Sequence, residues 1–410
     1  MWMVGQLGID SINAVGLSNR LFFLFILLVF GVNSGSAIFF GQYWGKGEIS
    51  GIHKVLGISF ITNMLLSSIF ASVAIFAPRW FLGILTQNPD VIELGVGYLR
   101  ILAASFFLSA FSLSLVAVLR AVRQVKIPML ASFIGLLFKL GINYLIIFVF
   151  DFGIVGAAWG TIGARIIEIS IQIWMIKRFR LPIFASIREH FAFDMAYVRN
   201  FFKTTLPVIL NEGIWALGIF IYEIFYQFAG HYSQSAVQIS ENVGHMFLML
   251  GFAIGHASGI IVANTLGAGD KELTISSSNK SLVIGGIIAV FIGILLFFAA
   301  PPILSTYNVP PDVARMATNN LRIVSSMAVF RILNFFFIVG ILRNGGDTLY
   351  CMFVDVLCVW LIGIPMAFLG TIVLGLPIYI VVAMVHMEEV IKFFVNLYRY
   401  KKGNWAKKLV

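Results

Sequence analysis

The sequence predicts an all-α protein with many membrane-spanning helices. Of its 410 residues, 60% are hydrophobic and only 11% are charged, whereas soluble domains are about half apolar and about a quarter charged. Long apolar runs, such as residues 21–30 and 283–300, lack the alternating pattern of a membrane β-barrel strand. The expected fold class is therefore an all-α polytopic membrane protein.

Individual spans are located by length, because a helix needs about 20 apolar residues to cross a bilayer. Eleven segments of the chain meet this condition. We predict spans near residues 17–40, 54–78, 98–119, 128–150, 155–177, 203–228, 236–263, 281–300, 316–341, 350–370 and 374–397.

Basic residues predict the orientation, because Lys and Arg are enriched in cytoplasmic loops. One set of loops holds five of them: Arg20, Arg79, Arg100, Arg315 and Arg322. The opposite set holds nineteen: Lys46, Lys54, Arg120, Arg123, Lys126, Lys177, Arg178, Arg180, Arg188, Arg199, Lys203, Lys271, Lys280, Arg343, Arg399, Lys401, Lys402, Lys407 and Lys408. We therefore expect a cytoplasmic C-terminus, and we attribute the net charge of +10 to topology and not to nucleic-acid binding.

An internal repeat becomes visible when the chain is shifted by about 222 residues. Leu99-Arg100-Ile101 then falls on Leu321-Arg322-Ile323, and one inserted residue places Leu119-Arg120 on Leu342-Arg343. The same shift aligns further pairs: Gly8 with Gly230, Ala14 with Ala236, Val15 with Val237, Ser18 with Ser240, Gly45 with Gly267, Gly47 with Gly269, Glu48 with Asp270 and Gly153 with Gly375.

The second repeat begins with the helix near residues 203–227, whose counterpart in the first repeat would lie before Met1. We therefore expect that a complete protein has six helices in each repeat and that this sequence lacks the first one. Two parallel repeats are an arrangement that transporters use, with substrate bound between the halves.

Five motifs, in order along the chain, resemble the multidrug and toxic compound extrusion (MATE) family. The likeness runs from Met1 to the tail, and residues 3–8 resemble the end of that family's first helix. The motifs are GVNSGSAIFFGQYWGKGE (31–48), YLRILAASFFLSAFSLSLVAVLRAVRQVKIPM (98–129), IVGAAWGTIGARIIE (154–168), LPVILNEGIWALG (206–218) and ILRNGGDT (341–348).

This resemblance implies two pseudo-symmetric helical lobes and efflux of drugs or organic cations in antiport with H⁺ or Na⁺. We expect an N-terminal lobe at 1–178 (helices two to six), a linker at 179–202, a C-terminal lobe at 203–398 (helices seven to twelve) and a basic tail at 399–410. The expected setting is the bacterial cytoplasmic membrane, as a monomer among its lipids. Two alternatives stay open: a related flippase for a lipid-linked substrate, and an inactive truncated fragment.

The motif LPVILNEGIW places Asn211 and Glu212 inside an apolar run. Glu212 lies about nine residues into its helix, roughly 13 Å deep, where a charged group costs about 2.5 to 3.5 kcal/mol. Ionisable groups at such depth are functional candidates. We predict that Glu212 binds the coupling H⁺ or Na⁺ and that Asn211 assists it; the resemblance independently implies an acidic coupling site here.

Other polar residues are weaker candidates for cavity or substrate contacts. Arg165 and Glu168 stand at i and i+3 on one helix and can pair, so a structural role is equally open. Asp355 lies inside its helix, Trp215 follows Glu212 by three residues, and Asn33 is a candidate for an interhelical hydrogen bond. A further group, Glu388, Glu389 and Lys392, is interpreted as a solvated or snorkelling cluster.

An enzyme is not expected, because the motifs HExxH and GxSxG and paired acidic catalytic motifs are absent from the sequence. We expect no cofactor and no bound metal besides the coupling ion. The two cysteines, Cys351 and Cys358, are seven residues apart on one predicted helix, which is too far for a disulfide.

Overall fold

The computed structural model describes residues 3, 6–150, 152–183, 186–230, 232–307 and 309–410. Within these ranges the regular structure is entirely helical, as the sequence predicts. The chain divides into two compact units, Met1–Ile209 and Leu210–Val410. Their boundary falls inside one long helix, α9 (Met195–Gln227). The lobe limits that we derived from the sequence, with a second lobe from residue 203, stay a prediction.

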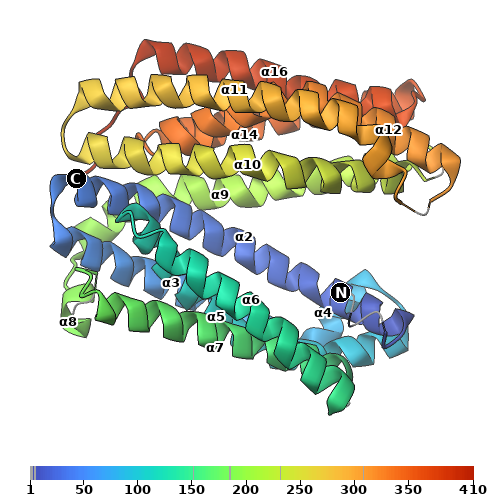
Figure 1. The fold of residues 1–410 in the computed structure, drawn as a ribbon, viewed down its shortest axis with the longest axis horizontal. Coiled ribbons are helices and arrows are strands. Elements are labelled where there is room, and N and C mark those ends of the chain that lie inside the picture. Colours follow the sequence, from blue (N-terminus) through green and yellow to red (C-terminus); the bar gives the residue numbers. More distant parts are fainter. Residues whose placement is uncertain (1–2, 4–5, 151, 184–185, 231, 308) are drawn as a thin grey trace. The chain divides into compact units, whose positions relative to one another are not determined.

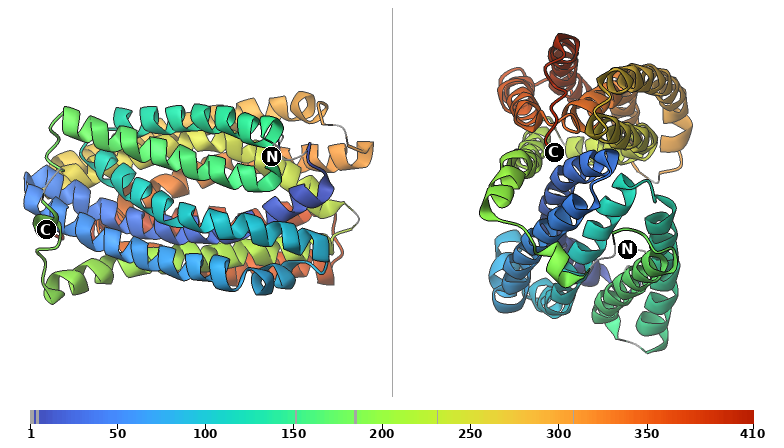
Figure 2. Two further views of the ribbon diagram at one scale, coloured as in Figure 1. Left: turned by 90° about the horizontal axis from the view of Figure 1, so that it is seen from below. Right: turned by 90° about the vertical axis from the view of Figure 1, so that its left-hand side faces the viewer.

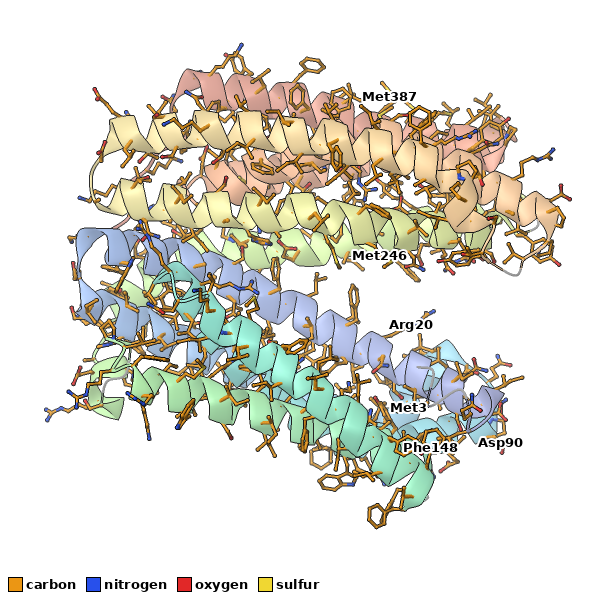
Figure 3. The ribbon with its side chains drawn as sticks, in the orientation of Figure 1. Met3, Arg20, Asp90, Phe148, Met246 and Met387 are labelled. Atoms are coloured by element: carbon orange, nitrogen blue, oxygen red, sulfur yellow. The ribbon has the colours of Figure 1, made fainter. Side chains whose placement is uncertain are left out.

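The first unit is built from long antiparallel helices (Figure 1). Asp90, near the start of α5, and Phe148, in η1, lie at the same end of the unit (Figure 3), as expected for successive helices that run in opposite directions. The helices are α2 (Ile9–Lys46), α3 (Ile49–Phe76), α4 (Pro78–Leu85), α5 (Pro89–Ala121), α6 (Lys126–Tyr144), η1 (Leu145–Val149), α7 (Gly153–Arg178) and α8 (Ile187–His190).

Aromatic side chains form the centre of this unit. Phe25 of α2 and Phe106 of α5 are fully buried and meet edge to face, with ring centroids 4.8 Å apart. Phe70 of α3 lies against both rings, at 5.6 Å from Phe25 and 6.3 Å from Phe106. Such pairs add about 0.5–1.5 kcal/mol beyond the area that they bury, so this cluster holds α2, α3 and α5 together.

The segment after α7 is attached to α3 by two histidines. The ring nitrogen Nε2 of His53 lies 2.7 Å from the carbonyl oxygen of Pro182, and Nδ1 of His190 lies 3.2 Å from the carbonyl oxygen of His53. Burial lowers the pKa of His190. Gly57 permits this approach, because a Cβ atom at that position would overlap the carbonyl oxygen of His190.

The second unit is also a bundle, which Figure 2 shows end-on. After the shared helix α9, the chain forms α10 and α11 and then a series of shorter segments, several of them π-helical. These are α10 (Ser233–Gly267), α11 (Lys271–Leu304), α12 (Pro311–Ser326), α13 (Ala328–Phe335), η2 (Phe336–Leu342), α14 (Thr348–Cys358), η3 (Val359–Gly363), α15 (Ile364–Phe368), η4 (Leu369–Val373) and α16 (Ile378–Lys402).

One predicted span, residues 316–341, is not a single straight helix. Its two parts, α12 and the run Ala328–Leu342, meet at an angle of 50°. The hydroxyl groups of Ser325 and Ser326 donate to the carbonyl oxygens of Leu321 and Arg322 at 2.7 and 2.8 Å. Serine side chains that bond back to the preceding turn are a known cause of helix bending.

The internal repeat recurs in the backbone conformation. Gly47 and Gly269, which the 222-residue shift aligns, have φ angles of 78° and 83°, and Gly153 and Gly375 have 55° and 57°. All four values lie in the left-handed region that glycine adopts at helix ends. The two repeats therefore end and restart their helices at equivalent places.

The spans agree with the prediction except at the C-terminal end. In the described part of the chain, nine helices are long and apolar enough to cross a membrane, or ten if the bent pair counts as one span. The eleventh prediction, residues 374–397, is helical as α16 but is not among them. The reason is that Glu388, Glu389 and Lys392 fall within its apolar part.

Candidate functional site

Glu212 forms an ion pair in the second unit with a residue that we had placed in a loop. The Nη1 atom of Arg343 donates to Oε1 of Glu212 at 2.9 Å. The side chain of Arg343 is only 2% exposed and that of Glu212 only 12%. Arg343 follows η2 in the turn before α14, as its assignment to a loop predicts, but its side chain is buried in the second unit and not exposed. The cytoplasmic side of this loop stays a prediction.

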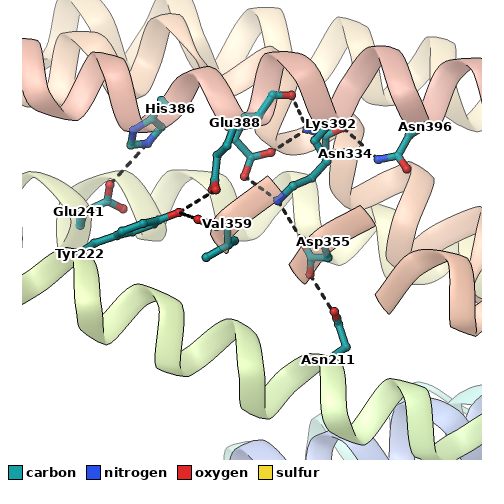
Figure 4. Close-up of polar contacts among 11 residues, drawn as sticks. Asn211, Tyr222, Glu241, Asn334, Asp355, Val359, His386, Glu388, Lys392 and Asn396 are labelled. Carbon is teal, nitrogen blue, oxygen red and sulfur yellow. Dashed lines mark hydrogen bonds and ion pairs between the residues drawn. The ribbon is translucent and has the colours of Figure 1, made fainter. Parts of the chain in front are cut away.

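Asn211, one residue earlier on α9, contacts a second carboxylate. Its Nδ2 atom donates to Oδ2 of Asp355 on α14 at 3.1 Å, and Lys392 of α16 donates to Oδ1 of the same carboxylate at 2.8 Å. The Oδ1 atom of Asn211 is buried, with no hydrogen-bond partner among the described residues. Asp355, predicted only as a possible contact, thus joins the same polar cluster as Asn211 (Figure 4).

Further polar residues extend this cluster along α16. Glu389 accepts from Nδ2 of Asn334 at 2.7 Å, and Glu388 accepts from the hydroxyl of Tyr222 at 2.7 Å. Glu388 and Lys392 are 5% and 2% exposed. The interpretation of these charges as a solvated or snorkelling group is wrong, because α16 turns them into the interior of the second unit (Figure 4).

A neighbouring group lies around Glu241 of α10. Its carboxylate oxygens are 3.3 Å from Nη1 of Arg331 and 3.8 Å from Nε2 of His386. His245, one turn along α10, lies 3.6 Å from the same carboxylate. Glu241 thus meets a basic or imidazole side chain from each of two other helices, α13 and α16.

Trp215 does not join the polar cluster in this structure. It is partly buried and packs against the apolar core of the second unit, in which Val359 and Ile332 take part. A contact of Trp215 with a transported compound stays a prediction.

Two predicted residues of the first unit do pair. Nη1 of Arg165 donates to Oε2 of Glu168 at 2.6 Å, and the hydroxyl of Ser132 donates to Oε1 of Glu168 at 2.7 Å. Glu168 is 5% exposed. This geometry satisfies both oxygens within α6 and α7, which is the structural role that we had considered; a role in a cavity is untested.

Asn33 lies in a separate hydrogen-bond network of the first unit. Its Oδ1 atom accepts from Nδ2 of Asn63 at 3.1 Å and from the hydroxyl of Ser59 at 3.4 Å. Asn63 also donates to Ser114 at 2.9 Å. These contacts join α2, α3 and α5, so Asn33 has the interhelical role that its sequence position suggested.

Two cavities have linings that do not include these predicted site residues. One, of about 510 Å³, is in the first unit and is lined mainly by apolar groups such as Phe60, Phe111 and Ile176. Another, of about 580 Å³, is in the second unit beside Arg315 and Asn319. Within the described ranges there is also no group of three or more His, Cys, Asp or Glu side chains placed to hold a metal ion.

The long apolar helices indicate a polytopic membrane protein, and an internal repeat with buried charges is a common feature of transporters. Residues 1–145 and 207–369 match the MatE family. The chain belongs to this family, which confirms the resemblance seen in the motifs.

Relatives support this assignment along nearly the whole chain. The uncharacterized transporter YisQ of Bacillus subtilis is 21% identical over 99% of this chain and 90% of its own length. The multidrug resistance protein MdtK of Photorhabdus laumondii is 25% identical over 96% of this chain and 86% of its own. The solved structure of the MATE transporter VcmN of Vibrio cholerae superposes with a TM-score of 0.90 at 17% identity, covering 99% and 92% of the two chains.

Proposed function

We propose that this protein is a secondary transporter that exports small organic cations in exchange for H⁺ or Na⁺, by alternating access of its two lobes. Membership of the MatE family and the printed names of relatives such as MdtK support multidrug efflux. The observation that carries the coupling proposal is a pair of buried carboxylates, Glu212 and Asp355, each held by one basic side chain and linked through α9 by Asn211.

A coupling ion that binds such a carboxylate competes with the internal cation. A buried ion pair contributes little net stability, because the desolvation of both charges offsets most of their attraction. When a proton or Na⁺ binds Glu212, the guanidinium of Arg343 loses this contact, and the cost of its uncompensated charge favours a rearrangement. The unsatisfied Oδ1 atom of Asn211 is a further oxygen ligand of the kind that hard cations take.

The other predicted contacts remain part of the proposal. Trp215 would contact an organic cation by its ring face, and Arg165, Glu168 and Asn33 would shape the first lobe. The proposed transport cycle involves no enzymatic reaction and no cofactor. Partners are the transported compound and membrane lipids, and the setting is the bacterial cytoplasmic membrane, with the chain as a monomer.

The test is efflux of an organic cation dye such as ethidium from vesicles containing the purified protein. Proton and sodium gradients are imposed separately, and the wild type is compared with Glu212→Gln. We expect the variant to lose gradient-driven efflux by about tenfold or more, equivalent to about 1.4 kcal/mol. Glu93→Gln is the matched control, because Glu93 is exposed and pairs with the exposed Arg79. Equal efflux by wild type and Glu212→Gln under both gradients would refute the coupling assignment.

A further inference from the structure

Glu388 differs from other buried acids of the second unit in forming no ion pair with the residues that the structure describes. Glu212, Asp355, Glu389 and Glu241 each lie within 4 Å of a basic nitrogen. Among the residues that the structure describes, Glu388 has no such ion pair, although it is only 5% exposed. An ionised carboxylate left unpaired in an interior costs several kcal/mol, and such a group commonly takes up a proton instead.

The hydroxyl of Tyr222 lies between two oxygen atoms that both accept hydrogen bonds. Its Oη atom is 2.7 Å from Oε2 of Glu388 and 3.3 Å from the carbonyl oxygen of Val359. A hydroxyl carries one proton and can satisfy only one of these oxygens. If Glu388 is protonated, its own O–H donates to Tyr222, and Tyr222 donates to Val359. The protonated state therefore satisfies both contacts (Figure 4).

The backbone of α14 to α15 is shaped around this contact. Val359 opens the π-helical segment η3, and its carbonyl oxygen also accepts the backbone N–H of Ile364. Gly363 closes the segment: a Cβ atom there would overlap the Tyr222 hydroxyl and lie 2.7 Å from Oε2 of Glu388. Single π-turns inside α-helices are frequent at functional sites. The position of the Glu388 carboxyl thus depends on the π-helical segment η3 of a neighbouring helix.

Charged groups surround the Glu388 carboxyl at a greater distance than Tyr222. Lys392 and Glu389 share α16 with Glu388, and Asp355 faces it from α14. Tyr226 of α9 lies beyond Tyr222, with ring centroids 6.4 Å apart. The group formed by Glu241, Arg331 and His386 continues on the side of α10 and α13. Because Lys392 already donates to Asp355 at 2.8 Å, its ammonium is committed to that carboxylate.

We infer that the Glu388 carboxyl, hydrogen-bonded to Tyr222, is a proton-binding site of the second unit that is separate from the Glu212–Arg343 and Asp355–Lys392 pairs. We take the bound ion to be a proton, because a separation of 2.7 Å between Oε2 and Oη is the distance of an O–H···O hydrogen bond. The existence of this site does not depend on the proposed function. Only its use rests on that function, in which the bound proton would be available for coupling.

Infrared spectroscopy of the purified protein in lipid vesicles tests the inference without substrate or gradient. The absorption of a protonated carboxyl C=O group is recorded from acidic to mildly alkaline pH, in sodium-free buffer and again with sodium. We expect the wild type to show a protonated-carboxyl band that Glu388→Gln lacks. Tyr222→Phe should shift the band to higher frequency, because the carboxyl loses its acceptor. The control Glu93→Gln should leave the band unchanged.

Each outcome of this experiment has a definite meaning. A band that persists unchanged in both Glu388→Gln and Tyr222→Phe would overturn the inference, as would a band removed by sodium at constant pH. If Glu388→Gln does not fold, the band of Tyr222→Phe decides by itself. If the protein shows the band but no gradient-driven efflux, the proton site stands and the proposed function fails. If it shows efflux but no band, the proposed function stands and the proton site fails.

Discussion

Arg343 is the residue on which the charge state of Glu212 depends. Both side chains are almost fully removed from solvent and 2.9 Å apart. Removing one partner of such a pair leaves an uncompensated buried charge, whereas replacing both can be nearly neutral. The free energy of unfolding should therefore respond very differently to single and double substitutions.

We predict that Arg343→Gln lowers the free energy of unfolding by about 3–5 kcal/mol, while the double variant Glu212→Gln/Arg343→Gln recovers most of this loss. The measurement is denaturant unfolding in detergent. Arg79→Gln is the control, because Arg79 forms an exposed pair with Glu93 and should cost about 0–1 kcal/mol. Equal losses in the single and double variants would mean that the pair is not the source of the effect.

The candidate site was only partly predictable at the level of residues. Depth in an apolar run identified Asn211, Glu212 and Asp355, because any polar group there needs a partner. The partners themselves were not predicted: Arg343 was assigned to a loop, and Lys392 to a solvated surface. The direction in which a side chain points depends on the rotation of its helix and on π-helical segments such as η2. A hydropathy profile gives no information about either.

At the scale of helices, the π-helical segment η3 makes a specific prediction about Gly363. A Cβ atom there would meet the Tyr222 hydroxyl, so Gly363→Ala must displace Tyr222 or α15. Overpacking of an interior costs about 1–3 kcal/mol. We expect Gly363→Ala to lower the free energy of unfolding by that amount and to shift the infrared band assigned to Glu388.

Gly286→Ala is the matched control for this substitution. Gly286 is also a helical glycine, on α11, but a Cβ atom there would meet nothing within 4 Å. Alanine favours a helix over glycine by about 1 kcal/mol, so this variant should be neutral or more stable. A Gly363→Ala protein as stable as Gly286→Ala would show that the close packing at η3 is not required.

The position of the segment between α7 and α9 depends on a close approach between the backbones of Gly57 and His190. Gly57 of α3 lies against the backbone of His190, and Gly57→Ala should push that segment away from α3. We expect trypsin to cleave at the exposed Arg188 about tenfold faster, as an opening made easier by about 1.4 kcal/mol implies. Gly83→Ala, which has open space around it, should leave cleavage unchanged; equal rates in both variants would contradict the proposed contact.

Span positions were largely predictable, whereas helix irregularities were not. Apolar length located every long helix, because the bilayer sets that length. The 50° bend after α12 arises from serine hydroxyls that bond to the preceding turn, and a count of apolar residues treats serine as neutral. The charged residues of α16 lowered the apolar character on which its prediction as a span depended. A count along one helix cannot show that these residues have partners on other helices.

At the scale of the whole molecule, the repeat and the basic residues predict an orientation. The nineteen Lys and Arg residues of one loop set include the tail, so the C-terminus is expected in the cytoplasm. The chain leaves α11 at Leu304, on the side that carries few basic residues. Thr306 and Lys408 are both exposed, and they lie on opposite sides of the membrane in this topology.

Single cysteines at these two positions would report the orientation directly. The native cysteines, Cys351 and Cys358, are 1% and 6% exposed and should contribute little background. In intact bacterial cells, a membrane-impermeant maleimide should label Thr306→Cys strongly and Lys408→Cys at the level of the unsubstituted chain. After the membrane is permeabilised, both should react equally. Labelling of Lys408→Cys but not Thr306→Cys in intact cells would invert the topology. It would also reverse the side from which α9 carries Asn211 and Glu212 into the membrane.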